Sequence, residues 1–250
     1  MDHKEIIEAY HRDGFAIIRQ FISSEELTKL TEVLQGYLRD IPPSATPGEI
    51  CYEEEQPDKI RCIFMMQERS DYFRQFGQHP RLIDIIEAVF AGADAVLENV
   101  QMINKVPYAS YRFPSHQDNA YAFWYPPDAV AATLAVDEST PVSGPIVCLK
   151  GSHTIGILPH QSSGISGASL ELVDPPDTEK FPEVPLCVQP GDLTLHHANV
   201  IHYTGPNQTD RDRRYIGFLY RSAKSKRDHQ AYGHYQKQLE HINLKSSKPK

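Results

Sequence analysis

Two short polar segments that lie far apart in the sequence contain residue types that together bind a metal ion. The first segment, Ser-His-Gln-Asp, places His116 and Asp118 two positions apart. The second segment, His-Tyr-Thr-Gly-Pro-Asn, begins at His202. Two histidines and one carboxylate can form a facial triad that leaves coordination positions open, which is typical of non-haem Fe(II) oxygenases. We therefore predict that His116, Asp118 and His202 are the metal ligands and the catalytic residues.

The spacing within the first segment has a structural reason. Alternate residues of an extended strand point to the same face, so a strand through this segment would direct both His116 and Asp118 into one interior. The His-x-Asp pair alone carries little weight in a chain with 12 histidines. The second segment adds to it, because a Pro-Gly-Asp turn at 190–192 begins a predicted strand and His202 follows in the same region.

Beyond His202, the sequence offers a partner for an organic anion. A cosubstrate such as 2-oxoglutarate chelates iron through its first carboxylate and its keto oxygen, so its far carboxylate needs a partner inside the protein. Arg213 is predicted to begin the strand Arg-Arg-Tyr-Ile-Gly-Phe, and its planar guanidinium can bind a carboxylate through two N–H groups. Thr204 shares the face of His202 on an extended strand and could donate its hydroxyl. Arg214 is the alternative to Arg213, because only one of two adjacent strand residues can enter the interior.

The first third of the chain is expected to be mainly helical. Residues 3–13 have helical periodicity and stop at Gly14. Ser23 and Glu26 match a capping box, which predicts a helix through about residue 38. Pro80 is expected in the first turn of a further helix. Two short strands are predicted at 15–20 and 59–66.

From residue 95 onward, short apolar runs alternate with Gly, Pro and Asn. Several short strands at this spacing predict a β-sandwich or jelly roll. Residues 161–183 are expected to form a long loop. We expect a single domain over 1–250. Its parts are a largely helical region at 1–94 packed on the barrel, a jelly-roll core at 95–222 and a C-terminal helix or tail at 223–250.

Composition and charge exclude several classes of protein. The 250 residues are 40% hydrophobic and 23% charged, and the formal net charge of −8 argues against a nucleic-acid partner. No apolar run is long enough to span a bilayer. The four cysteines are scattered without a Cys-x-x-Cys pair, which argues against a disulfide framework and a thiolate zinc site. The N-terminal segment is charged and has no apolar core of signal-peptide type, so a cytoplasmic location is expected.

These motifs together resemble the phytanoyl-CoA dioxygenase (PhyH) family of Fe(II)/2-oxoglutarate-dependent oxygenases. The resemblance covers nearly the whole chain, in the right order. The matching segments are the opening at 11–27, Met-Ile-Asn-Lys at 102–105, His-Gln-Asp at 116–118, residues 144–153, Pro-Gly-Asp at 190–192, and the His202 segment followed by Arg213. One departure is Lys150, which stands where the family usually has a Pro in a structural turn.

The resemblance implies a mainly β fold with flanking helices, the double-stranded β-helix (jelly roll, cupin-like). It implies a dioxygenase that uses Fe(II), 2-oxoglutarate and O2. Arg213 would bind 2-oxoglutarate, and Gln101, Asn104 and Thr204 would line the same pocket by position. Halogenating relatives replace the carboxylate by Gly or Ala, so Asp118 indicates hydroxylation of an unactivated C–H bond, with release of succinate and CO2.

Other outcomes remain open at this point. The same cofactor chemistry can lead to desaturation, cyclisation or epimerisation of a secondary metabolite. The barrel could also be a non-catalytic module that binds a metal or ligand, or a cupin that uses O2 without a cosubstrate. Among the histidines, His196 has the strand parity of His202 and competes with it as third ligand. The spacing to Arg213 favours His202, and His197 is interpreted as a hydrogen-bonded structural residue.

The segments around the His-Gln-Asp motif suggest where a substrate would bind. Tyr121 and Trp124 could form the wall of an apolar pocket or hold a cationic amine by cation–π contact, although ordinary packing explains them equally well. Arg112 could bind a carboxylate or phosphate of the substrate. We expect a small-molecule substrate and neither a nucleic-acid nor a membrane partner, and the sequence makes no prediction of oligomeric state.

Overall fold

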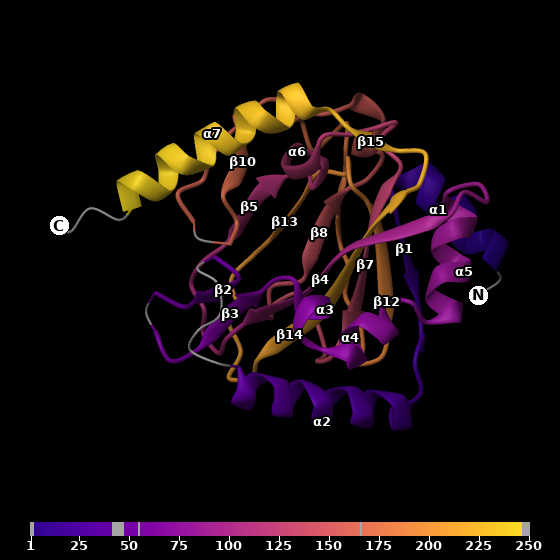
Figure 1. The fold of residues 1–250 in the computed structure, drawn as a ribbon, viewed down its shortest axis with the longest axis vertical. Helices are drawn as coiled ribbons and strands as arrows, with labels where there is room; N and C mark the ends of the chain where they lie inside the picture. The colour runs from indigo at the N-terminus through magenta and orange to yellow at the C-terminus, as the bar shows by residue number, and fades with distance from the viewer. Residues whose placement is uncertain (1–2, 42–47, 55, 166, 247–250) are drawn as a thin grey trace.

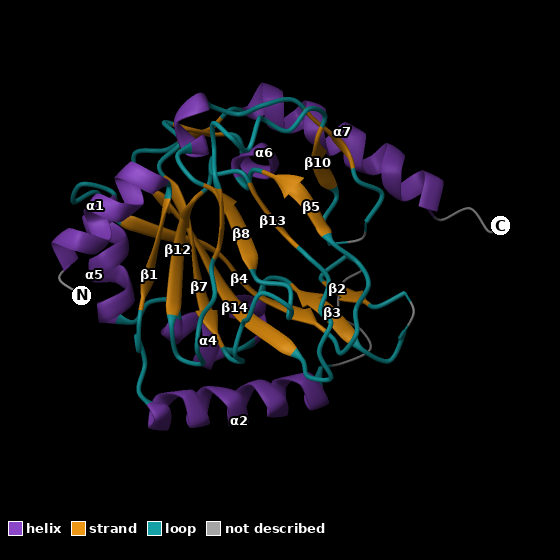
Figure 2. Ribbon diagram, turned by 180° about the vertical axis from the view of Figure 1, so that it is seen from behind, coloured by secondary structure: helices purple, strands orange, loops and turns teal. Residues whose placement is uncertain are grey.

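Two antiparallel sheets form the centre of the molecule (Figures 1 and 2). The computed structural model describes residues 3–41, 48–54, 56–165 and 167–246, with side chains as far as residue 237. The strands of the larger sheet are β1 Phe15–Ile18, β2 Ile50–Tyr52, β3 Ile60–Ile63, β4 Ala95–Lys105, β7 Ala129–Ala135, β12 Leu193–His197 and β14 Arg213–Ser222. Within the described residues their order is β1-β12-β7-β14-β4-β3-β2.

The smaller sheet carries the other wall of the barrel. Its strands are β5 Phe113–His116, β8 Ile146–Leu149, β11 Glu183–Pro185 and β13 His202–Thr204, in the order β11-β8-β13-β5. Two further pairs of strands form small sheets of their own: β9 His160–Ser162 with β10 Leu170–Leu172, and β6 Trp124–Tyr125 with β15 Lys226–Arg227. The prediction of a long loop over 161–183 is therefore wrong in part, because β9 and β10 pair within it.

Helices cover the outer face of the larger sheet and the open end of the barrel (Figures 1 and 2). Their bounds are α1 His3–Asp13, α2 Ser24–Asp40, α3 Met66–Arg69, α4 Asp71–Phe76, α5 Pro80–Val89, α6 Asn119–Ala122 and α7 His229–Ser246, with a 3-10 turn at Ser152–Ile155. Residues 247–250 of the predicted C-terminal tail lie outside the described residues. Among the helices that are described, none combines the length and apolar character needed to cross a membrane.

Strand alternation separates the interior of the barrel from the face covered by helices. In β14, Ile216 and Phe218 belong to the core under the helices. Tyr215, which has the opposite parity, packs instead with Ile146 and Cys148 of β8. The two sheets therefore face each other, and alternate residues of each strand reach the space between them.

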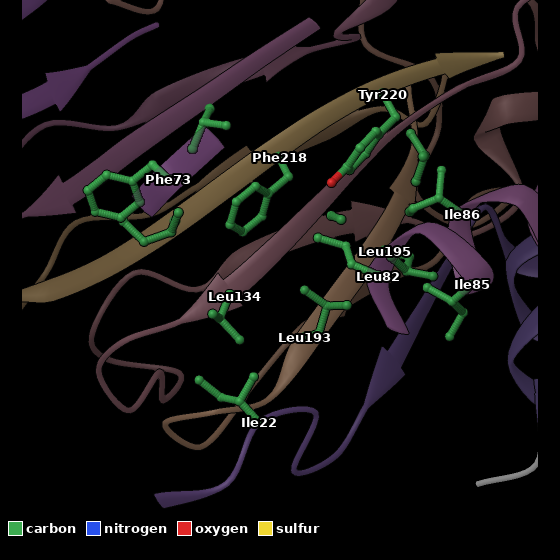
Figure 3. Packing of buried hydrophobic residues seen from close by; sticks show 14 of the residues in the cluster. Ile22, Phe73, Leu82, Ile85, Ile86, Leu134, Leu193, Leu195, Phe218 and Tyr220 are labelled. Carbon is green, nitrogen blue, oxygen red and sulfur yellow. The ribbon is translucent and has the colours of Figure 1, made fainter. Parts of the chain in front are cut away.

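The main core fills the layer between the larger sheet and the helices (Figure 3). Phe218 is fully buried there, and its ring stacks on that of Phe76 in α4 at 5.4 Å between centroids. The helices contribute apolar side chains at helical spacing, such as Leu82, Ile85 and Ile86 of α5. This layer fixes the larger sheet as a rigid platform behind the barrel interior.

Most local predictions agree with the structure. Helix α1 ends at Asp13, and Gly14 follows with a φ of +86°, where a side chain would also collide with His153. The capping box of Ser23 and Glu26 opens α2, and Pro80 stands in the first turn of α5. The first 94 residues also supply β1, β2 and β3 to the larger sheet, so the barrel draws strands from both sides of residue 95. The four cysteines are free.

We expect Phe218→Ala to lower the free energy of unfolding by about 3–5 kcal/mol, because it removes a buried ring and leaves a cavity in close-packed surroundings. Urea unfolding followed by circular dichroism measures this loss. Val142→Ala is the control, since Val142 is 51% exposed, and it should change stability by less than about 0.5 kcal/mol. A loss below about 1 kcal/mol for Phe218→Ala would show that the layer refills the space by relaxation.

Candidate metal centre

Three side chains from the smaller sheet and its edge converge on one point inside the barrel. His116 ends β5, His202 begins β13, and the two residues are direct cross-strand partners. Asp118 completes the group, and one ligand atom from each residue lies within 4.8 Å of the others. Asp118 Oδ1 is 3.6 Å from Nε2 of His116 and 3.7 Å from Nε2 of His202. The structure thus brings together the three residues that the sequence predicted.

The backbone reaches this geometry by a different route from the one predicted. Strand β5 stops at His116, and Asp118 has helical angles (φ −58°, ψ −35°) at the start of α6. The prediction that a continuous strand places His116 and Asp118 on one face is therefore wrong. The buried side chain of Gln117 causes the change of direction, because it donates to the carbonyl oxygens of Gly156 and Asn199, at 2.7 Å each.

Further hydrogen bonds fix the segment around the carboxylate. The backbone N–H of Leu158 donates to Oε1 of Gln117, and the backbone N–H of Gln117 donates to Nε2 of His160. Asn119 donates to Oδ1 of Asn199 at 3.1 Å. Asn199 lies in the connection between β12 and β13, so the first and second ligand segments are held to each other by buried amides.

Contacts with the backbone determine which ring nitrogen carries the proton in His116 and His202. His116 Nδ1 lies 2.7 Å from the carbonyl oxygen of Pro114, and His202 Nδ1 lies 3.1 Å from that of Val200. A carbonyl oxygen only accepts, so Nδ1 carries the proton in both rings and Nε2 keeps its lone pair for a metal. Burial lowers the pKa of His202 to about 3, which keeps this imidazole neutral.

The carboxylate of Asp118 is held in its ionised form. Burial by itself would raise its pKa, but the neighbouring histidines, first His202 and then His116 and His196, bring the pKa well below the usual range. Two neutral nitrogen ligands and one anionic oxygen ligand suit a divalent transition metal such as iron. The residues present therefore fit the metal that the sequence motif implies.

A second group of polar side chains lies deeper in the barrel. Arg213 is 1% exposed, and its Nε, Nη1 and Nη2 have no hydrogen-bond partner among the described residues. Its guanidinium lies 4.1 Å from the ring centroid of Tyr215. The buried hydroxyl of Thr204 also has no partner among these residues. Arg214 points to the other side of β14, where it forms an ion pair with Asp137 at 2.7 Å. The structure therefore directs Arg213, rather than Arg214, to the interior.

Lys105 belongs to the same group, although the sequence analysis did not identify it. It is the cross-strand partner of Arg213, and its Nζ donates to the carbonyl oxygen of Tyr111. Burial and then the charge of Arg213 lower the pKa of Lys105 to about 6. Its side chain passes so close to Gly144 that a Cβ there would lie 2.8 Å from Lys105 Cδ. Strand parity with Gln101 was the signal that could have revealed it.

Comparison with known proteins identifies the family of the chain. The model of the phytanoyl-CoA dioxygenase (PhyH) family matches residues 10–215. The chain belongs to the phytanoyl-CoA dioxygenase family. It is 26% identical over 244 residues to an ectoine dioxygenase from Sphingopyxis alaskensis, a match that covers 90% of this chain and 77% of that protein. The predictions of the family and of a dioxygenase-class enzyme are confirmed.

Solved structures show the same fold. EctD from S. alaskensis, solved with 2-oxoglutarate and 5-hydroxyectoine, superimposes with a TM-score of 0.75 at 20% identity, over 91% of this chain and 78% of that chain. The epimerase SnoN, solved with Fe3+, alpha-ketoglutarate and nogalamycin RO, gives a TM-score of 0.72 at 20% identity, over 90% of this chain and 85% of that chain. The predicted jelly-roll fold is confirmed.

Gln101 and Asn104 are the two other residues predicted to contact the cosubstrate, and they lie on opposite faces of β4. Gln101 faces the interior, where it lies across Gly217 and accepts a hydrogen bond from Asn99. Asn104 lies on the face of the helix-covered core and donates to Asp212 at 3.0 Å. Its predicted place in the pocket is not supported, because residues three apart on a strand cannot share a face.

The predicted substrate contacts also differ in position. Tyr121 lies next to the site, with its ring 5.9 Å from that of His116 and its hydroxyl accepting from the backbone of Leu170. Trp124 already has two cations beside its ring, since the guanidinium carbons of Arg221 and Arg227 are 4.8 and 4.6 Å from its centroid. These contacts argue against a role of Trp124 in binding an amine.

Arg112, the third predicted substrate contact, is not directed to the barrel interior by any contact that we observe. Its charge acts on the phenol of Tyr203, whose pKa is raised to about 12 by burial and by Glu183, and it opposes that rise in part. Tyr203 lies between His202 and Thr204 in β13, so it faces the outside of the smaller sheet, where it packs with Leu149 and Ile201. The predicted contact of Arg112 with a substrate is therefore not supported.

His197, which follows His196 in β12, generates a pH prediction. Burial first, and then the charges of His153 and His11, lower the pKa of His197 to about 3, against about 6.5 in an unfolded chain. Between these values the unfolded state binds the extra proton, so stability falls as the pH decreases, by about 1.4 kcal/mol per pH unit. His197→Asn should remove this part of the slope while its amide oxygen still accepts from Asn199.

Urea unfolding of the metal-free protein at pH 7.5, 6.0 and 5.0 would measure the slope. His229→Asn, at an exposed histidine, is the matched control. Equal slopes for His197→Asn and the unmodified protein would contradict a neutral, half-buried His197.

Proposed function

We propose that the protein is an Fe(II)- and 2-oxoglutarate-dependent dioxygenase that hydroxylates an unactivated C–H bond of a small molecule. The observation that carries this proposal is the pairing of two incomplete sites in one barrel. The triad of His116, Asp118 and His202 has room for an ion, and Arg213 is a buried cation without a hydrogen-bond partner among the described residues. A metal satisfies the first site, and the far carboxylate of 2-oxoglutarate satisfies the second.

The second site favours an anion on energetic grounds. A buried guanidinium without a hydrogen-bond acceptor loses its hydration without compensation, which is costly for a charged group. Lys105 beside it is a second basic group, and burial together with the charge of Arg213 lowers its pKa to about 6. A carboxylate bound between Arg213 and Thr204 would offset both effects, with the guanidinium donating through two N–H groups. The interior is therefore prepared for an acid rather than for an apolar molecule.

Different residues of the chain would bind the metal and orient the cosubstrate. His116, Asp118 and His202 would hold iron, and Arg213 and Thr204 would orient the cosubstrate relative to it. When bound, iron and 2-oxoglutarate together activate O2, with release of succinate and CO2 and transfer of one oxygen atom to the substrate. The buried amides of Gln117, Asn119 and Asn199 hold the ligand segments in place before the substrate arrives.

Hydroxylation is the outcome that the site supports best. Asp118 is present and lies half-buried against the two histidines, so the position that halogenating relatives leave open is filled. Relatives in the comparisons include an ectoine dioxygenase and an epimerase, whose reactions differ although their folds agree. We propose a small-molecule substrate and, as predicted from the sequence, a cytoplasmic enzyme.

An anaerobic titration tests the proposal. Fe(II) and then 2-oxoglutarate would be added to the purified protein, and the visible spectrum recorded. A weak metal-to-ligand charge-transfer band on addition of 2-oxoglutarate is expected, and its absence would remove the cosubstrate from the proposal. Succinate release from a panel of candidate substrates, with mass spectrometry of the products, then separates a mass gain of one oxygen atom from the loss of two hydrogens or no net change.

Asp118→Ala should abolish 2-oxoglutarate-dependent succinate release, because the triad loses its only anionic ligand while the fold keeps its core. Fe(II) binding by isothermal titration and thermal unfolding of the metal-free protein would separate these two effects. Asp174→Ala, at an exposed carboxylate, serves as control. Full turnover by Asp118→Ala would exclude Asp118 from the ligand set.

Arg213→Leu should raise the apparent KM for 2-oxoglutarate by about 30-fold or more, because removal of one partner of a buried charged pair costs about 2 kcal/mol or more. Arg214→Leu is the matched control on the neighbouring residue, and its KM should stay within about threefold. Initial rates of succinate formation at varied 2-oxoglutarate give both values. An effect confined to Arg214→Leu would reverse the assignment of the two arginines.

A further inference from the structure

His196 lies inside the barrel beside the candidate metal centre but outside its set of ligands. Alternation in β12 directs it to the interior with Thr194, whereas Leu193 and Leu195 belong to the core under the helices. The residue is 3% exposed, and its ring centroid is 4.5 Å from that of His202. The sequence made it a rival for the third ligand position, and the structure gives it a different contact.

The two carboxylate oxygens of Asp118 contact different histidines. Oδ1 is 3.6 and 3.7 Å from the Nε2 atoms of His116 and His202, which is too long for a hydrogen bond and leaves room for an ion. Oδ2 is 3.1 Å from Nε2 of His196, which is within hydrogen-bond range. One oxygen therefore faces the metal position, and the other is occupied by His196.

His196 carries its proton on a different ring nitrogen from His116 and His202. His116 and His202 donate from Nδ1 to backbone carbonyls and direct the lone pair of Nε2 toward the metal position. The ionised carboxylate of Asp118 only accepts, so Nε2 of His196 must carry a proton. A protonated nitrogen cannot be a metal ligand. His196 is therefore a hydrogen-bond donor to a ligand, and not a ligand itself.

Packing alone does not account for a histidine at this position. Nδ1 of His196 is buried and has no hydrogen-bond partner among the described residues. A buried polar atom without a partner costs free energy, and an apolar side chain of similar size would avoid that cost. The contact with Asp118 is the hydrogen bond that the ring makes in the described part of the chain, so the residue serves the carboxylate.

We propose that His196 is a positioning residue that restricts Asp118 to metal coordination through Oδ1 alone. A carboxylate that binds a metal through both oxygens takes one coordination position more than a carboxylate that binds through one. With Oδ2 held by His196, that position stays open for O2 after the cosubstrate has bound. This inference rests on the proposed metal role of Asp118, and it assigns to His196 the control of how that ligand binds.

Three variants separate the hydrogen bond from the bulk of the ring. His196→Phe keeps a ring but has no donor, and His196→Leu is a second variant without a donor. His196→Gln places an amide N–H near the position of Nε2 and should restore the contact. Thr194→Val is the control on the same strand and face, since its hydroxyl is directed to the backbone of Thr133 and not to Asp118.

The measurement uses Co2+ in the place of iron, because its visible absorption depends on coordination number. We expect His196→Phe and His196→Leu to weaken Co2+ binding by about 10–100-fold and to change the spectrum, as for other residues that orient a ligand. His196→Gln and Thr194→Val should keep both the affinity, within about threefold, and the spectrum. Thermal unfolding without metal establishes that each variant is folded, and the second donor-free variant replaces the first if that one is not.

Two results would overturn the proposal. One is a donor-free variant with the affinity and spectrum of the unmodified protein. The other is a His196→Gln variant as impaired as the donor-free ones, which would show that the shape of the ring matters instead. Failure of the proposed function would look different, as Co2+ binding by the unmodified protein without any 2-oxoglutarate-dependent succinate release with Fe(II), and the comparison of the His196 variants would still stand.

Discussion

The geometry of the metal centre depends on a buried amide network rather than on the strands that carry the ligands. The side chain of Gln117 joins the turn after β5 to the connection between β12 and β13 and to the segment before β9. Asn119 and Asn199 add a second link between the same segments. Buried amides must satisfy every donor and acceptor, so they accept only one arrangement of the backbone around them. The carboxylate of Asp118 is placed by this requirement.

The interior of the barrel is polarised along its length. Near the open end, Asp118 brings a negative charge among the imidazoles, and deeper in the barrel Arg213 brings a positive charge beside the basic side chain of Lys105. The charges of Asp118 and Arg213 lie apart in the barrel and do not pair with each other. Each therefore raises the free energy of the folded protein unless it has a partner of its own. A metal cation beside Asp118 and a carboxylate beside Arg213 would supply these two partners. The shape of the barrel thereby selects for two ligands that occupy it together, and the rigid layer under the larger sheet maintains the separation between them.

Local patterns in the sequence were sufficient to predict most elements, whereas features that depend on distant contacts were missed. Helix α2, strands β4 and β14, and the inward direction of His202 are all explained by capping and alternation. Alternation alone already places Gln101 and Asn104 on opposite faces of a strand, so the expectation that both line one pocket came from position in the family motif and not from local information. The end of β5 at His116 could not be predicted, because Gln117 is directed by partners about 40 and 80 residues away in the chain.

The single tryptophan of the chain lies between the carboxylate segment and the C-terminal region. Trp124 is hydrogen-bonded through its backbone to Asn119, which directly follows Asp118, and its indole touches the guanidinium groups of the strand before α7 and of β14. Its emission therefore reports from one location on both the carboxylate loop and the C-terminal helix region. The fluorescence of the native protein should provide a label-free optical signal of events at the centre, with no engineered dye.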